Sequence, residues 1–144
     1  MGVVIDCGTG QETVEPGPVL SVAERKLEMV ESIKAIRDTH IAGGTTVQGI
    51  GVFDSDDAAR LNITGAVVMA QVALAANQPF SMSWKLANNT LVTLNATQMI
   101  AVGIAAGTHV AACHARAQAL GVAVQAAASH DDLDAIDLSS GWPS

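Results

Sequence analysis

Residues 78–98 read QPFSMSWKLANNTLVTLNATQ and lie between two long alanine-rich runs. The large apolar side chains of this stretch stand at every second position and are Phe80, Met82, Trp84 and Leu86. A period of two predicts a strand with one buried face. Asn88 and Asn89 tolerate the left-handed backbone of a tight turn, and the β-favouring residues 91–94 supply a returning strand. The stretch therefore predicts a β-hairpin.

A helix start follows this hairpin directly. Asn95 can accept a hydrogen bond from the free amides of a first helical turn, and Gln98 can reach back to Asn95, which is the arrangement of a capping box. Alanine, the best helix former, is frequent in the residues that follow. We therefore expect a helix from Ala96 to about Ala128, with a bend at Gly121.

A second capping box lies upstream. Ser21 and Glu24 have the same three-residue spacing, and apolar residues at helical spacing follow them. The glycine pair at 43–44 ends this pattern. The sequence therefore predicts a helix over residues 22–42.

The segment between these two helices predicts a further hairpin and a further helix. Residues 45–53 alternate around a central glycine, which favours a small hairpin. Ser55 is expected to cap the next helix, with Asp56 and Asp57 stabilising the positive end of the helix dipole. This helix should end near Ala76, just before a proline.

The N-terminal residues predict an extended arm. Residues 3–5 form a short β-favouring run, residues 6–10 a turn and residues 12–14 a return strand. A lone two-stranded hairpin is marginal in water, so we expect the arm to need a partner surface, either on its own domain or, as we favour, on another chain. The Pro-Gly-Pro sequence at 16–18 should hold it away from the first helix.

The predicted organisation is a β arm with its linker over residues 1–20 and a helical domain with hairpins over residues 21–144. The fold class is α+β and mainly α, with about three helices, a long alanine-rich helix toward the C-terminus and two short hairpins. The length of 144 residues fits one domain.

Large side chains are scarce in this composition. Hydrophobic residues make up 49% of the chain but aromatic residues only 3%, so the core must be built mainly from small aliphatic side chains. We expect Trp84 and Phe80 to supply the large apolar area that an alanine-rich core lacks, and Trp84 to be largely buried. Phe53 and Trp142 are the other two expected structural anchors.

The net charge of −7 argues against two classes of partner. It opposes nucleic-acid backbones and anionic membrane surfaces, and the sequence offers no basic stripe to overcome the repulsion. The most apolar run, residues 63–76, is interrupted by Gln71 and is expected to be too short to span a bilayer. No nucleic acid and no membrane are expected as partners.

The cysteines and histidines do not form a recognisable site. Cys7 and Cys113 are expected to be free, buried thiols, since their spacing suggests no disulfide framework. His109 and Cys113 share one helix side at i, i+4, with His114 beside them, but two aligned ligands do not make a metal site. We expect no metal and no cofactor.

Motifs for catalysis are likewise missing from the sequence. It contains no Gly-x-Ser-x-Gly elbow, and its early glycine-rich turn lacks the lysine of a phosphate-binding loop. We expect a protein that is not an enzyme.

Two glycines mark one face of the long helix. Gly103 and Gly107, one turn apart, allow another backbone to approach closely, either within the chain or from an oligomer partner. The acidic tail over residues 130–144 is expected to be a solvated face with a few apolar anchors.

Three stretches taken in order resemble a known family. They are IKAIRDTHIAGGTTVQGIGVFDSDDAARLN, AANQPFSMSWKLANNTLVTLNATQM and the closing segment DLSSGWP, preceded by CHARAQAL. Over about residues 30–143 the chain resembles the uncharacterised domain found toward the C-terminal end of tailed-phage and prophage tail-fibre and tail-assembly proteins. The most specific elements are Ile33-Lys34, Arg37-Asp38, Gly43-Gly44, Phe53, Ser55-Asp56, Arg60, Trp84-Lys85, Val92-Thr93 and Gly141-Trp142-Pro143. The resemblance implies a setting and no catalytic residues.

The leading hypothesis is therefore a non-enzymatic structural virion protein, an accessory of the tail fibre, tail tip or baseplate, made in the host bacterial cytoplasm. A tail-fibre assembly chaperone and a capsid decoration protein are the alternatives. The expected partners are other phage virion proteins and further copies of the chain in a homo-oligomer. The residues expected to dock are those of the arm, with the glycine face as a secondary contact: Val3, Val4, Ile5, Val14, Gly103 and Gly107.

Overall fold

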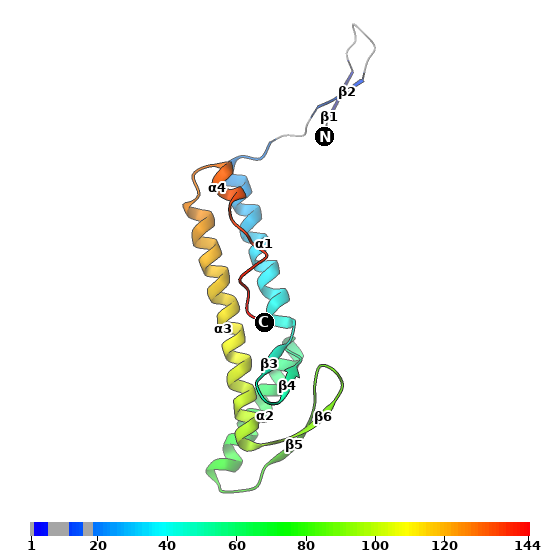
Figure 1. The fold of residues 1–144 in the computed structure, drawn as a ribbon, viewed down its shortest axis with the longest axis vertical. Helices are drawn as coiled ribbons and strands as arrows, with labels where there is room; N and C mark the ends of the chain where they lie inside the picture. Colours follow the sequence, from blue (N-terminus) through cyan, green and yellow to red (C-terminus); the bar gives the residue numbers. More distant parts are fainter. Residues whose placement is uncertain (1, 6–11, 16–18) are drawn as a thin grey trace.

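The computed structural model describes residues 2–5, 12–15 and 19–144, which form an elongated rod with a hairpin at one end (Figure 1). The elements in chain order are β1 (Gly2–Ile5), β2 (Glu12–Glu15), α1 (Val22–Ala42), β3 (Thr45–Val47), β4 (Gly51–Phe53), α2 (Asp57–Ala75), β5 (Ser81–Lys85), β6 (Leu91–Asn95), α3 (Ala96–Ala126) and α4 (His130–Asp134). The predicted α+β, mainly α class is confirmed. The expected turn at 6–10 and the linker at 16–18 lie outside the described residues.

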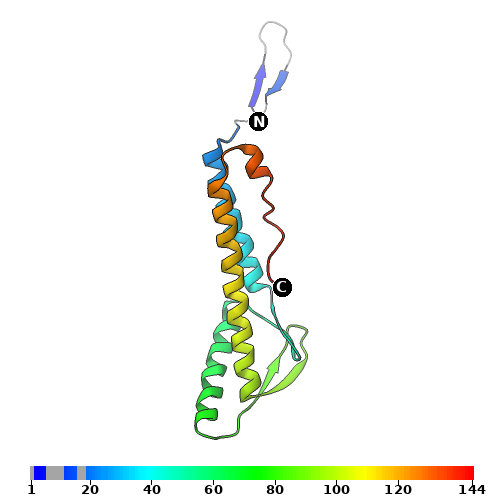
Figure 2. The same cartoon turned by 60° about the vertical axis from the view of Figure 1, so that its left-hand side comes forward.

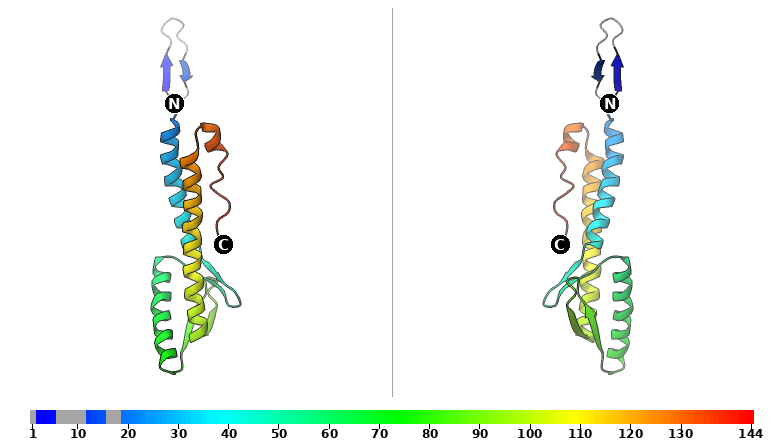
Figure 3. Two further views of the ribbon diagram at one scale, coloured as in Figure 1. Left: turned by 90° about the vertical axis from the view of Figure 1, so that its left-hand side faces the viewer. Right: turned by 90° about the vertical axis from the view of Figure 1, so that its right-hand side faces the viewer.

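Helix α3 is the axis of the rod, and α1 and α2 lie end to end along it (Figures 2 and 3). Its first half packs against α2 and its second half against α1. We call the first of these regions, with β3–β6, the hairpin half, and the second, with residues 127–144, the tail half. Each half has its own buried cluster.

The starts of α1 and α3 follow the predicted caps. Both capping boxes are present, at Ser21 with Glu24 and at Asn95 with Gln98. Helix α3 begins at the predicted residue and runs continuously through Gly121. These ends could be predicted because a cap depends on neighbours three residues away and not on the tertiary fold.

The core of the hairpin half is built where the two small hairpins meet α2 and α3. Strands β3 and β4 pair from Thr45 opposite Phe53, and β5 pairs with β6 through Trp84 opposite Val92. Asn89 has the predicted left-handed backbone, with φ of 68°. The fully buried residues of this core are Phe53, Ala70, Met99 and Val102, with Leu94 at 1% exposure.

The aromatic residues that were expected as anchors of this core are buried to different extents. Phe53 is fully buried, whereas Trp84 and Phe80 are partly buried and pack against the same cluster, so Trp84 is the less buried of the two rings in contact. The ring centroids of Trp84 and Phe53 are 6.3 Å apart. Trp84 belongs to a two-stranded sheet, and its side chain covers Phe53 from outside while remaining in contact with solvent.

The tail half contains one element that the sequence did not predict. Ser129 accepts a hydrogen bond from the amide of Asp132 and caps the short helix α4. Leu133 of this helix is 1% exposed and packs between α1 and α3. Ile136, Leu138 and Trp142 follow it onto the same cluster, which confirms the acidic tail as a solvated segment with apolar anchors.

The predicted cap at the start of α2 is wrong. Asp56, not Ser55, caps α2 through its hydrogen bond with the amide of Ala59. The Ser55 hydroxyl is buried; it accepts from the amide of Gly44 at 2.8 Å and donates to the carbonyl of Ile41 at 2.7 Å. Ser55 therefore ties the end of α1 to the start of α2.

Candidate docking surfaces

The N-terminal hairpin stands apart from the helices. Strand β1 pairs antiparallel with β2, with Val3 opposite Val14, Val4 opposite Thr13 and Ile5 opposite Glu12. In every view it lies beyond the start of α1 and away from the helical domain (Figures 1–3). Among the described strands, β1 and β2 pair only with each other, so each presents an open backbone edge. Such an edge can accept a further strand.

The two predicted docking glycines differ in their surroundings. A Cβ atom at Gly103 would lie 2.6 Å from Cγ2 of Val67, so this glycine lets α2 and α3 of the same chain approach closely. A Cβ at Gly107 would meet nothing within 4 Å. The structure therefore gives Gly103 an intramolecular role and leaves Gly107 on an open surface.

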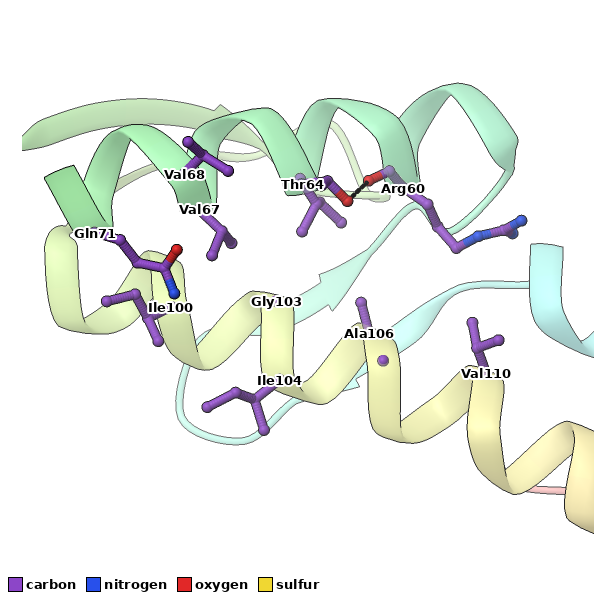
Figure 4. A pocket seen from close by; sticks show the side chains of 12 residues that line it. Arg60, Thr64, Val67, Val68, Gln71, Ile100, Gly103, Ile104, Ala106 and Val110 are labelled. Carbon is purple, nitrogen blue, oxygen red and sulfur yellow. Dashed lines mark hydrogen bonds between the residues drawn. The ribbon is translucent and has the colours of Figure 1, made fainter.

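That open surface is a groove of about 610 Å³ between α2 and α3 (Figure 4). Val68 forms its rim on α2 and Ile104 its rim on α3, and these side chains are 53% and 65% exposed. Arg60 lies at one end, and most of the lining is aliphatic. The groove can accept an apolar ridge, but it holds no arrangement of groups for acid–base chemistry.

The solvent-facing side of α2 continues this apolar surface. Leu61, Val68 and Val72 share the side opposite the buried Ile63 and Ala66, and their exposed fractions lie between 53% and 72%. The sequence carries a signal for this face, although its α2 residues were not among the predicted docking residues. No charged residue occurs between Leu61 and the end of the helix, whereas a solvent-facing helix side normally carries charges.

Of the residues considered for metal binding, His109 and Cys113 are buried side by side, whereas His114 is exposed. His109 is buried, and its Nε2 lies 2.8 Å from the carbonyl oxygen of His40, so this nitrogen carries a proton and donates. Cys113 Sγ is 3.8 Å from the same nitrogen. A protonated Nε2 has no lone pair for a metal. Among residues 2–5, 12–15 and 19–144, no three His, Cys, Asp or Glu side chains gather as metal ligands would.

The predicted free, buried thiol is confirmed for Cys113, while Cys7 lies outside the described residues. Burial raises the pKa of the Cys113 thiol above its ordinary value. The thiolate is the nucleophilic form of cysteine, so this shift disfavours nucleophilic chemistry.

The Gly-Trp-Pro segment fastens the C-terminus to the rod. Gly141 has a φ of +79°, and a Cβ there would lie 2.9 Å from the guanidinium of Arg116. Arg116 donates to the carbonyl of Ser140 through Nε and Nη2. The Trp142 ring stacks on the His40 ring, with 5.3 Å between the ring centroids. The Nε1 atom of Trp142 donates a hydrogen bond to the carbonyl oxygen of Leu138 at 2.8 Å. Trp142 is thus a structural anchor, as predicted.

Two helices pass a membrane test that rests on length and composition alone. They are α2 and α3, and the most apolar window of α2 is 17% buried. The 19 residues of α2 include the apolar run 63–75 and the charged Asp57 and Arg60 before it, so the helix as a whole has the length of a span although the expected run is shorter. The same test is passed by core helices of soluble proteins, so it decides nothing by itself.

Comparison with known proteins identifies the family. The family model described as "Domain of unknown function (DUF4376)" matches residues 24–139, and the chain belongs to this family. No curated protein and no solved structure matches the chain. The match covers nearly the same residues as the resemblance to tail proteins, but its description names no function. The tail-protein setting therefore stays a prediction.

Proposed function

We propose that this member of the DUF4376 family is a non-enzymatic structural protein of a tailed-phage or prophage virion. It is an accessory of the tail fibre, tail tip or baseplate and acts by docking on other virion proteins. The resemblance over residues 30–143 supplies the setting. The hairpin β1–β2 supports the proposed docking.

The position of β1–β2 is the observation that supports docking. The hairpin projects beyond the rod, and its two strands have open outer edges among the described strands. Strand addition satisfies the backbone hydrogen bonds of such an edge on a partner. A two-stranded hairpin gains stability from a third strand, so the partner would stabilise the arm as the arm binds it.

The remaining chemistry favours binding over catalysis. His109 is engaged by a backbone carbonyl, and Cys113 is buried with a raised pKa. The groove between α2 and α3 is mostly aliphatic. These features favour a protein that works through its surfaces.

Deletion of residues 1–18 in a phage that carries the gene tests the proposal. The truncated protein should fold, because both buried clusters lie within residues 22–142. Circular dichroism and thermal melting of the purified protein check this. Mass spectrometry of purified virions should find the full-length protein and lose the truncated one.

Three outcomes would contradict the proposal in different ways. A full-length protein that is needed for assembly yet absent from purified virions would identify an assembly chaperone. A stoichiometry matching the major capsid protein would identify a capsid decoration protein. Incorporation of the truncated protein at normal stoichiometry would move the docking surface to the helical domain.

A further inference from the structure

Helix α2 carries apolar residues on every side, apart from Asn62, Thr64 and Gln71 after its charged first turn, yet only three of its residues are buried. These are Ile63, Ala66 and Ala70, which face α3 and the hairpins. A helix that is apolar all round is normally buried all round. In this chain the hairpins β3–β4 and β5–β6 cover one face of the α2–α3 pair, and the opposite face is open (Figure 3).

The total surface of the chain is larger than that of a compact monomer. A folded monomer of 14.7 kDa is expected to expose about 7,000 Å². This chain exposes 8993 Å², an excess of about 2,000 Å². The projecting arm accounts for part of it. A stable interface removes about 800 Å² from each partner, so the excess is large enough to include one.

The open face carries a row of exposed side chains with an apolar hollow on each side. Val68 and Val72 form a ridge along α2. The groove with rim Ile104 lies on one side of the ridge, and a second apolar hollow, which Phe80 helps to line, lies on the other. The ridge of one copy can therefore enter the groove of another while its own groove receives the partner's ridge, as a two-fold interface requires.

Charge favours a second copy over an anionic bilayer as the occupant of this face. The chain carries a net charge of −7, so two copies repel each other wherever acidic surfaces meet. The face from Leu61 to the end of α2 carries no charge, nor does α3 from its start to Thr108. An anionic bilayer would instead be favoured by basic residues beside the apolar face, and only Arg60 lies there.

We propose that two copies of the chain associate through this face, so that two antiparallel α2–α3 pairs form a four-helix bundle. Four-helix bundles are commonly built from such helix pairs. The apolar stripe runs from Leu61 to Ala75, with Val68 at its middle. The two α2 helices cross antiparallel, and Val68 lies next to its counterpart at the two-fold axis. The dimer does not depend on the proposed virion function.

Analytical ultracentrifugation of the full-length chain tests this dimer. The wild type should have twice the mass of 14.7 kDa. Val68→Glu and Ile104→Glu should each give a monomer with unchanged helical circular dichroism, because both side chains are exposed within one copy. The matched controls are Leu27→Glu and Val122→Glu, which are equally exposed apolar positions in the tail half and should remain dimeric.

A charge-complementation experiment tests the two-fold axis itself. Val68→Lys alone should be monomeric, as Val68→Glu is. An equal mixture of the two variants should recover the dimer, because opposite charges meet at the axis. A mixture that stays monomeric would overturn the antiparallel geometry.

Three results would overturn self-association through this face. They are a wild type that stays monomeric at every concentration, a dimer that survives both Val68→Glu and Ile104→Glu, and loss of the dimer in the Leu27→Glu control.

Flotation with phosphatidylcholine vesicles gives a separate result. A monomeric wild type that floats, and a Val68→Glu variant that does not, would assign the face to a membrane surface. Loss of residues 1–18 should leave the dimer intact, so failure of the virion proposal and failure of this one are distinguishable.

Discussion

The tail half and the hairpin half pack against the same helix, but their solvent-facing sides differ in charge. Helix α1 carries eight Asp, Glu, Lys or Arg residues in 21, whereas α2 carries two in 19. Beside α1, the groove along α3 has Lys34 and Arg37 among its lining residues. Beside α2, the corresponding groove has Val68 and Ile104 as its rims. One side is suited to water and the other to a protein surface.

The two contacts that α3 makes, with α1 and with α2, also differ in which other parts of the chain pack over them. The chain itself covers the seam between α1 and α3, because Leu133, Ile136, Leu138 and Trp142 fold back across it. The seam between α2 and α3 is covered by hairpins on one face only. A two-helix rod has too little interior to bury both faces of its helices. The difference shows that this chain completes one half by its own tail and leaves one face of the other half open.

The largest effect is expected from Phe53→Ala in the hairpin half. The side chain is fully buried at the contact of β4 with the helices, so its removal should lower the free energy of unfolding by about 3–5 kcal/mol. Urea denaturation at fixed protein concentration measures this. Trp84→Ala is the control and should cost less, because Trp84 is only partly buried. An equal loss for Trp84→Ala would show that β5–β6 carries the core instead.

Ser55→Ala tests the tie between the two halves. The substitution leaves the amide of Gly44 and the carbonyl of Ile41 without their buried partner, which should cost about 1–3 kcal/mol. The exposed Ser81→Ala is the matched control, with almost no expected change. A single urea transition that shifts as a whole would show that the halves unfold together. Separate transitions for the two halves would show that Ser55 couples them only weakly.

Two glycine substitutions in the hairpin half should have opposite signs. Gly103→Ala drives a methyl group into Val67 and should destabilise the chain by about 1–3 kcal/mol. Gly107→Ala meets no neighbour and should stabilise α3 by up to about 1 kcal/mol. Both are measured by urea denaturation in the Val68→Glu background, which keeps self-association out of the comparison. A destabilising Gly107→Ala would place an unseen contact at that position.

The smallest effect is an acid transition confined to the tail half. Hydrogen bonds from Ser140 and Ser139 lower the pKa of Asp137 from 3.8 to about 2. A lowered pKa in the folded chain contributes stability above 3.8, and this contribution is lost as the pH falls toward about 2. The indole N–H resonance of Trp142, which donates to Leu138, should shift in this window. In Asp137→Ala the shift should be absent, and its persistence would assign the transition to another group.

Sequence patterns predicted the parts of the fold that depend on near neighbours. The caps at Ser21 and Asn95 and the turn at Asn89 each depend on residues at most three positions away. Phe53 was correctly expected as an anchor, but its greater burial than Trp84 was not, because burial depends on what the rest of the chain places above each side chain. The same reason explains why α4 was missed.

The candidate surfaces were predicted in part. The arm was recognised from its β-favouring residues, and β1–β2 forms the expected hairpin. The glycine spacing located the correct stretch of α3, but the sequence could not show that Val67 occupies the space beside Gly103. The roles of Ser55 and Arg116 were missed because their partners lie 11 or more residues away along the chain.

Helix α3 also has a mechanical consequence. It is a single helix of 31 residues, about 46 Å long, and it runs through both halves without a break. The arm lies at one end of the rod and α2 at the other (Figure 1). Consider a pulling force between a partner bound to the arm and a second copy bound to α2. This force would act parallel to α1 and α3, which pack side by side, so it would load their contact in shear. With both proposed attachments in place, the helices would act as a stiff spacer between the start of α1 and α2.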